Sequence, residues 1–81
     1  MSTAKIEKLV RMANQIGEFF EPFAEDVATE GVKTHLRKFW TPKMIGEIVG
    51  YLDSGGSGLN ANAARGAAAL KTEHVFPSLR E

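Results

Sequence analysis

The sequence has no cysteine, and its charges balance, with ten Lys and Arg against ten Asp and Glu in 81 residues. Without thiols the chain forms neither a disulfide nor a thiolate metal site. A net charge of zero gives no electrostatic basis for binding nucleic acid or an anionic membrane. We therefore expect no nucleic-acid partner and no membrane partner, and we expect a cytoplasmic protein.

Long apolar runs are also missing. No segment approaches the ~20 apolar residues of a membrane span. The N-terminal residues alternate basic with apolar side chains, unlike the uninterrupted apolar core of a signal peptide. A chain of this length forms one small unit, whose core supplies only about 3–5 kcal/mol of net stability. Burial against a partner would add to that stability.

Patterns of catalytic or metal-binding residues are scarce. The two histidines, His35 and His74, lie far apart, and neither has a second ligand at the spacing of a metal site. The glycine-rich stretch 55–58 lacks the Lys-Ser or Lys-Thr pair that follows a phosphate-binding loop. We expect no catalytic residue, no cofactor and no metal, and we predict that the chain is not an enzyme by itself.

The spacing of apolar residues predicts helices. Residues 2–20 follow the i, i+3, i+4, i+7 pattern of a helix with one buried stripe, and Met12, Phe19 and Phe23 lie beside that stripe. These three side chains predict an apolar arc wider than one neighbouring helix covers. Pro22 ends the first helix, and a second is expected from about Glu25 or Asp26 to Trp40. Its inward residues are expected to be Val27, Gly31, Val32, Leu36 and either Phe39 or Trp40.

Thr41 and Pro42 predict the start of a third helix, because a hydroxyl caps a helix N-terminus and proline fits its first position. This helix is expected to run to about Leu52 and to end in the glycine-rich stretch. Residues 60–70 are alanine-rich and compatible with a short fourth helix capped by Asn60 or Asn62. Residues 71–81 around Pro77 are expected to form an extended tail. The prediction is an all-α protein, a small bundle of three main helices in residues 1–59, followed by the alanine-rich segment and the tail in residues 60–81.

The stretch His35–Met44 is the expected binding corner. Phe39 and Trp40 point about 100° apart on a helix, so one small core is not expected to bury both. Either one aromatic is free to bind a partner, with Arg37 one turn away, or both close the core. The amides of residues 14 and 15 either face water or hydrogen-bond across an interface. The candidate partner-interface residues are Asn14, Gln15, His35, Arg37, Trp40, Pro42, Lys43 and Met44.

Three short stretches resemble a known family. They are 12–17 (MANQIG) followed by the Phe pair at 19–20, 35–44 (HLRKFWTPKM) and 55–59 (GGSGL). In this order they resemble the small delta subunit of NAD-dependent, molybdenum-containing formate dehydrogenases. They occur in order within residues 5–59.

The resemblance implies a small helical accessory subunit of a cytoplasmic formate dehydrogenase complex. In that family the other subunits hold the molybdenum cofactor, the iron–sulfur clusters and the flavin, and the delta subunit carries no redox centre. The resemblance further implies a role in assembly or maturation through contact with the large molybdenum-bearing catalytic subunit. Two alternatives stay open at this point: a helical protein that associates with itself, and a nucleic-acid-binding helical module.

Overall fold

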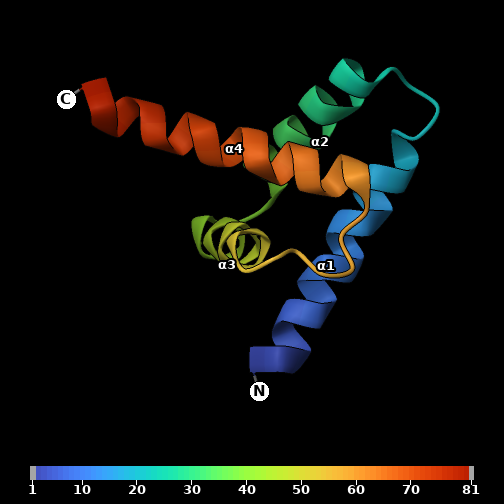
Figure 1. Cartoon of the computed structure of the whole chain (residues 1–81), viewed down its shortest axis with the longest axis horizontal. Helices are drawn as coiled ribbons and strands as arrows, with labels where there is room; N and C mark the ends of the chain where they lie inside the picture. The colour runs from blue at the N-terminus through green and yellow to red at the C-terminus, as the bar shows by residue number, and fades with distance from the viewer. Residues whose placement is uncertain (1, 81) are drawn as a thin grey trace.

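Four helices make up the described part of the chain in the computed structural model, which covers the backbone of residues 2–80 and the side chains of residues 5–73. They are α1 (Ser2–Phe19), α2 (Glu25–Phe39), α3 (Pro42–Asp53) and α4 (Ala61–Arg80). Figure 1 shows α4 lying across α2, with α3 and α1 on the other side of α4 and the far end of α4 projecting beyond the bundle. No strand occurs within residues 2–80. The predicted all-α fold is confirmed.

The helix boundaries follow from local sequence. Glu25 and Asp26 occupy the first turn of α2, where carboxylates oppose the positive end of the helix dipole. Trp40 follows α2 in an extended conformation. Thr41 is extended too, because the following Pro42 disfavours the helical region for the residue directly before it. The Oγ1 atom of Thr41 accepts a hydrogen bond from the backbone N–H of Met44 at 3.1 Å. The predicted junction between the second and third helices is therefore confirmed.

The core takes side chains from all four helices. Along α2 the buried residues are Ala28, Val32 and Leu36, four residues apart, so they form a single inward stripe. The prediction that Val27 points inward was wrong, because one residue along a helix turns the side chain by about 100° away from that stripe. Val27 is half exposed. The buried cluster consists of Leu9, Ala13, Val32, Leu36, Trp40, Ile45, Ile48, Ala63 and Leu70.

Helix α4 is longer than predicted. The sequence suggested a short fourth helix and an extended tail from residue 71, but the helix continues through Pro77 to Arg80. The small residues of α4 allow it to pack closely on α2. At Gly66 the two helices are so close that a Cβ atom would overlap the side chain of Val32. The core therefore continues from residues 1–59 into α4. Asn60, one of the two predicted caps, accepts a hydrogen bond from the N–H of Ala63 at 2.8 Å.

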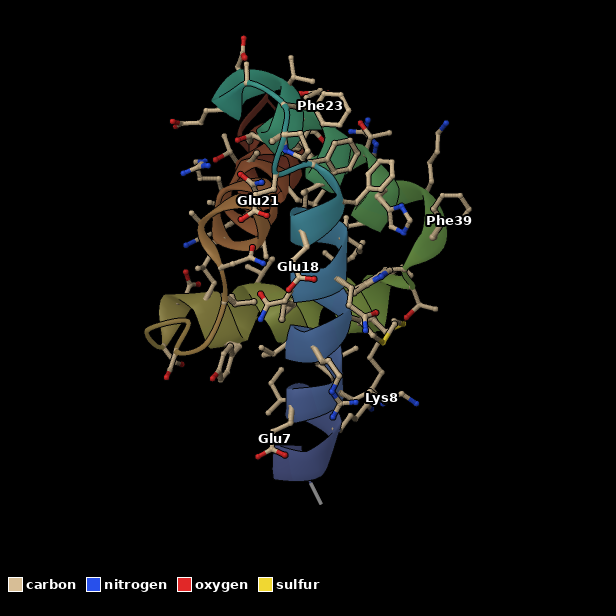
Figure 2. The ribbon with its side chains drawn as sticks, turned by 90° about the vertical axis from the view of Figure 1, so that its right-hand side faces the viewer. Glu7, Lys8, Glu18, Glu21, Phe23 and Phe39 are labelled. Atoms are coloured by element: carbon tan, nitrogen blue, oxygen red, sulfur yellow. The ribbon has the colours of Figure 1, made fainter. Side chains whose placement is uncertain are left out.

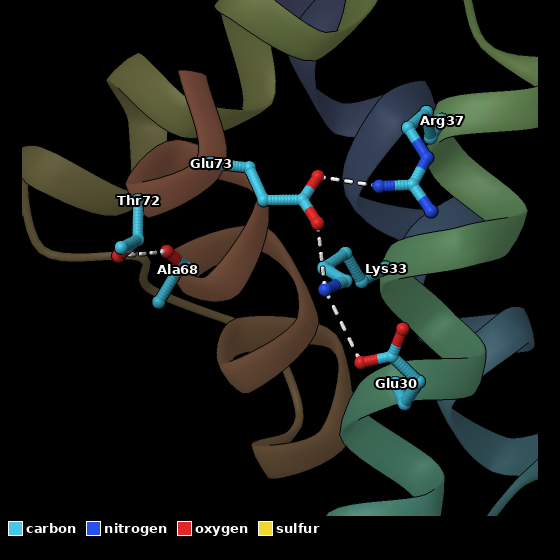
Figure 3. Close-up of polar contacts among 6 residues, drawn as sticks. All are labelled: Glu30, Lys33, Arg37, Ala68, Thr72 and Glu73. Carbon is cyan, nitrogen blue, oxygen red and sulfur yellow. Dashed lines mark hydrogen bonds and ion pairs between the residues drawn. The ribbon is translucent and has the colours of Figure 1, made fainter. Parts of the chain in front are cut away.

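A carboxylate on α4 binds two cations on α2, beyond the predicted end of the fourth helix (Figure 3). Glu73 lies 2.8 Å from the Nζ atom of Lys33 and 2.5 Å from the Nη1 atom of Arg37. The hydrogen bonds from Lys33 and Arg37 lower the pKa of the Glu73 carboxyl below its ordinary value, and the bonds to Glu73 and Glu30 raise the pKa of Lys33. These contacts favour helix over an extended tail at residues 71–73.

Candidate functional site

Asn14, a predicted interface residue, forms its hydrogen bonds within the chain. Its Oδ1 atom accepts from the N–H of Asn60 at 2.8 Å, and its Nδ2 atom donates to the carbonyl of Gly58 at 2.8 Å. The Nδ2 atom of Asn60 donates to the carbonyl of Asn14 at 3.0 Å. The amide thus satisfies a pair of backbone groups, as its chemistry suggested, but the pair belongs to the loop between α3 and α4.

Most of the corner around the α2–α3 junction also has an intramolecular role. Arg37 binds Glu73, and Trp40 is buried in the core. Met44 is partly buried and packs against that core. Pro42 begins α3 and, like Lys43, is exposed. The interface role predicted for these five residues stays a prediction, and they do not form one continuous exposed surface.

The two remaining predicted residues, Gln15 and His35, meet in a hollow between α1 and α2. This hollow has a volume of about 470 Å³. A second hollow of about 680 Å³ adjoins it along α2, and the two share Phe20 and His35. We call the pair of hollows the aromatic groove. Its lining residues are Met12, Gln15, Ile16, Phe19, Phe20, Asp26, Val27, Glu30, Gly31, Thr34, His35, Lys38 and Phe39.

Large apolar side chains stand exposed along this groove. Phe39 is 70% exposed and Phe19 is 69% exposed, while Phe23, at the turn beside the groove, and Val27 are each 50% exposed. Figure 2 shows Phe23 at the top of the molecule and Phe39 at its right, with Glu18 and Glu21 below Phe23 and to the left of Phe39. A contiguous apolar surface of this kind marks an interaction site in a small protein.

Aromatic contacts fix the floor of the groove. The ring centroid of Phe20 lies 5.0 Å from that of Phe19, with the rings edge to face, and 5.7 Å from that of Phe23. The Phe20 ring covers Gly31 of α2, where any Cβ would overlap it. Gly31 is therefore a site of close contact between α2 and the Phe20 ring. At the other end, the imidazole of His35 lies 4.7 Å from the Phe39 ring.

Charged side chains stand at the two ends of the groove. Asp26 and Glu30 line it near the turn between α1 and α2, and Lys38 lines it near the end of α2. Between these ends the lining offers carbon, the amide of Gln15, the hydroxyl of Thr34 and the imidazole of His35. Among the residues whose side chains are described, no group of three His, Asp or Glu side chains is placed to hold a metal ion. Chemically, this arrangement can accept an apolar surface, and the charges at its two ends can favour one orientation of that surface.

The aromatic groove was only partly foreseen. The signal was the width of the apolar arc on the first helix, to which Met12, Phe19 and Phe23 contribute. Phe39 is absent from the candidate interface residues, which include Trp40 from this pair instead. Helical spacing shows that the two rings point apart but does not show which one turns into the core.

One protein family matches most of the chain. The model of the family described as NADH-dependent formate dehydrogenase delta subunit, FdsD, matches residues 8–67. The chain belongs to this family. The matched range contains every lining residue of the aromatic groove and most of the buried core. No curated protein and no solved structure matches the chain. No helix within the described residues is long and apolar enough to cross a membrane.

Proposed function

We propose that this chain is a non-catalytic accessory subunit of a cytoplasmic, NAD-dependent formate dehydrogenase. In this proposal the aromatic groove docks on the large molybdenum-bearing catalytic subunit and assists its assembly or maturation. The observation that carries the proposal is the row of exposed aromatic side chains in a member of the delta subunit family. The absence of cysteine is in keeping with a reducing compartment.

The energetics favour a partner at this surface. Four large apolar side chains are half or more exposed along the groove. Full burial of one such side chain contributes about 1.5–3 kcal/mol, so a partner that covers several of them gains affinity mainly from apolar contact. None of the groove residues belongs to the buried cluster. Three of them, Met12, Ile16 and Phe20, are partly buried and pack against it. The core is therefore complete while the aromatic rim is still free to bind.

The chemistry of the groove fits assembly better than catalysis. Its uncharged polar groups, the amide of Gln15, the hydroxyl of Thr34 and the imidazole of His35, lie among carbon surfaces. Such a surface can cover an apolar region that a catalytic subunit exposes before its cofactor and neighbouring subunits are in place. The molybdenum chemistry in this proposal belongs to the catalytic subunit.

The proposal is tested by producing the formate dehydrogenase subunits with and without this chain. We expect the enzyme made without the chain to contain several-fold less molybdenum per catalytic subunit and to show a matching loss of formate-dependent NAD reduction. Adding the purified chain to the finished enzyme should not restore either quantity, because maturation precedes catalysis. Equal molybdenum content in both preparations would contradict the maturation role.

Light scattering on the isolated chain addresses the self-association alternative. A mass that rises with concentration, together with failure to co-purify with the catalytic subunit, would favour a homo-oligomeric helical protein. The proposed function predicts a constant monomer mass over the concentrations at which the catalytic subunit binds.

A further inference from the structure

Two helix faces form the walls of the aromatic groove. On α2, Val27, Gly31 and His35 follow one another at intervals of four residues, with Phe39 four residues further on. The other wall comes from α1, through Met12, Ile16 and Phe19. At a rise of 1.5 Å per residue, the α2 wall from Val27 to Phe39 is about 18 Å long. This length corresponds to about three turns of a helix lying between the two walls.

We infer that the aromatic groove binds an amphipathic helix of the catalytic subunit, about three turns long, with a basic side chain at one end and an acidic side chain at the other. This inference rests on the proposed function, since it names the element of the same partner that occupies the groove. An apolar stripe on such a helix, at spacings of three and four residues, meets the two walls as a helix does in other helix-binding grooves.

The charges along the groove determine the polarity of its occupant. Asp26 and Glu30 lie at the end near the turn, and both are exposed. Glu30 pairs with Lys33 at 3.2 Å, yet its side chain is 64% exposed and open to a second cation. A basic side chain of the occupant is favoured at this end because it faces two carboxylates.

The opposite end of the groove is basic. Lys38 lines it on α2. An acidic side chain of the occupant is favoured beside this lysine. The groove therefore distinguishes a helix with opposite charges at its ends from one with a single sign of charge.

A second copy of this chain fits the groove less well. A two-fold contact places the same surface on both sides of the interface, so the hollow of one copy would face the hollow of the other. Two facing hollows of about 470 Å³ each leave a void that close packing disfavours. A helix from a different chain presents a ridge to the hollow and fills it.

Photo-crosslinking in the assembled complex tests this inference. The variant Phe39→p-benzoylphenylalanine is produced with the catalytic subunit, irradiated, and the crosslinked peptide is identified by mass spectrometry. The site is 70% exposed, so the substitution is compatible with the fold. We expect the crosslink to fall on a segment of the catalytic subunit with apolar residues at helical spacing and opposite charges at its two ends. A crosslink to a second copy of this chain, or to a segment without helical spacing, would overturn the inference.

A charge reversal tests the polarity independently. We expect Lys38→Glu to weaken the binding of the purified catalytic subunit by about three- to tenfold, and an acidic-to-Lys change in the crosslinked segment to restore it. The matched control is Lys71→Glu, which makes the same change of charge on α4. Its ion pair with Asp53 is solvent-exposed, so its loss costs little. Equal affinities of the Lys38→Glu variant and the control would overturn the predicted polarity.

The two experiments separate this inference from the function on which it rests. If the complex forms and matures normally but the crosslink lies on a loop or a strand, the accessory function stands and the helical occupant is wrong. If no complex with the catalytic subunit forms at all, both are wrong.

Discussion

Phe39 and Trp40 are neighbours in the chain, yet Trp40 is 6% exposed and Phe39 is 70% exposed. The end of α2 separates them: Phe39 is the last helical residue, and Trp40 turns away from the helix in an extended conformation. The indole then packs in the cluster that contains Leu36, Ile45 and Ile48. Phe39 is left beside His35 on the outer face, where it belongs to the aromatic groove.

Substitution of these two aromatics should have opposite consequences. Replacing a buried large aromatic by alanine costs about 3–5 kcal/mol, which is comparable to the whole stability of a domain this small, so Trp40→Ala should be largely unfolded. Phe39→Ala should leave the free energy of unfolding, obtained from the urea titration, within about 0.5 kcal/mol of the wild-type value. Far-UV circular dichroism during urea titration measures both. A folded Trp40→Ala variant would contradict the assignment of Trp40 to the core.

Substitutions of the neighbouring amides Asn14 and Gln15 should also differ in their effect on stability. Asn14→Ala removes two hydrogen bonds from the α3–α4 loop, at about 0.5–1.5 kcal/mol each, so a loss of about 1–3 kcal/mol in the free energy of unfolding is expected. Gln15 is exposed on the groove, and Gln15→Ala should change stability little. Urea unfolding of the two variants side by side is the measurement, and equal destabilisation would count against the described role of Asn14.

Two glycines offer a matched test of the α2–α4 contact. A methyl group at Gly66 would overlap Val32, so Gly66→Ala should destabilise by about 1–3 kcal/mol. A Cβ at Gly46, on α3, would meet nothing within 4 Å, so Gly46→Ala should stabilise by about 0.4–1 kcal/mol through reduced entropy of the unfolded chain. Thermal melts of both variants show directly whether each substitution lowers or raises the melting temperature. Stabilisation by Gly66→Ala would show that α4 does not pack closely on α2.

The Glu73 ion pairs predict a pH dependence of stability. The folded state lowers the pKa of this carboxyl below 4.5, so the charged form is favoured on folding. The stabilisation is therefore present above pH 4.5 and is lost as the pH falls through the lower pKa of the folded state. Glu73→Gln lacks this stabilisation at every pH. The melting temperature of the wild type should exceed that of the variant at pH 7, and the difference should shrink below pH 4.5. A difference that stays constant with pH would exclude the ion pairs as its cause.

Sequence reasoning located the helix boundaries where a local signal exists. Thr41 and Pro42 specify a helix start through a cap and a fixed φ, and the structure contains both features. Pro22 separates the first two helices for a similar local reason. The stripe Val32 and Leu36 follows from helical periodicity, although periodicity alone did not distinguish Val27 from Ala28 as the next member.

The features that sequence reasoning missed depend on tertiary contact. The continuation of α4 past residue 70 is favoured by the bonds of Glu73 to Lys33 and Arg37 on α2, which local sequence around a proline does not reveal. The exposure of Phe39 depends on the direction in which the chain leaves α2. To predict the extent of α4 or the exposure of Phe39, one must know where helices distant in sequence lie relative to one another.

The most direct test of the aromatic groove as the docking surface is co-purification of the catalytic subunit with the tagged chain. The double variant Phe19→Ala and Phe39→Ala removes the two most exposed aromatics of the groove, and Gly46→Ala on α3 is the folded control. Our account predicts that the double variant retains at least tenfold less catalytic subunit than the wild type, while the control retains the same amount. Equal recovery with all three proteins would contradict it.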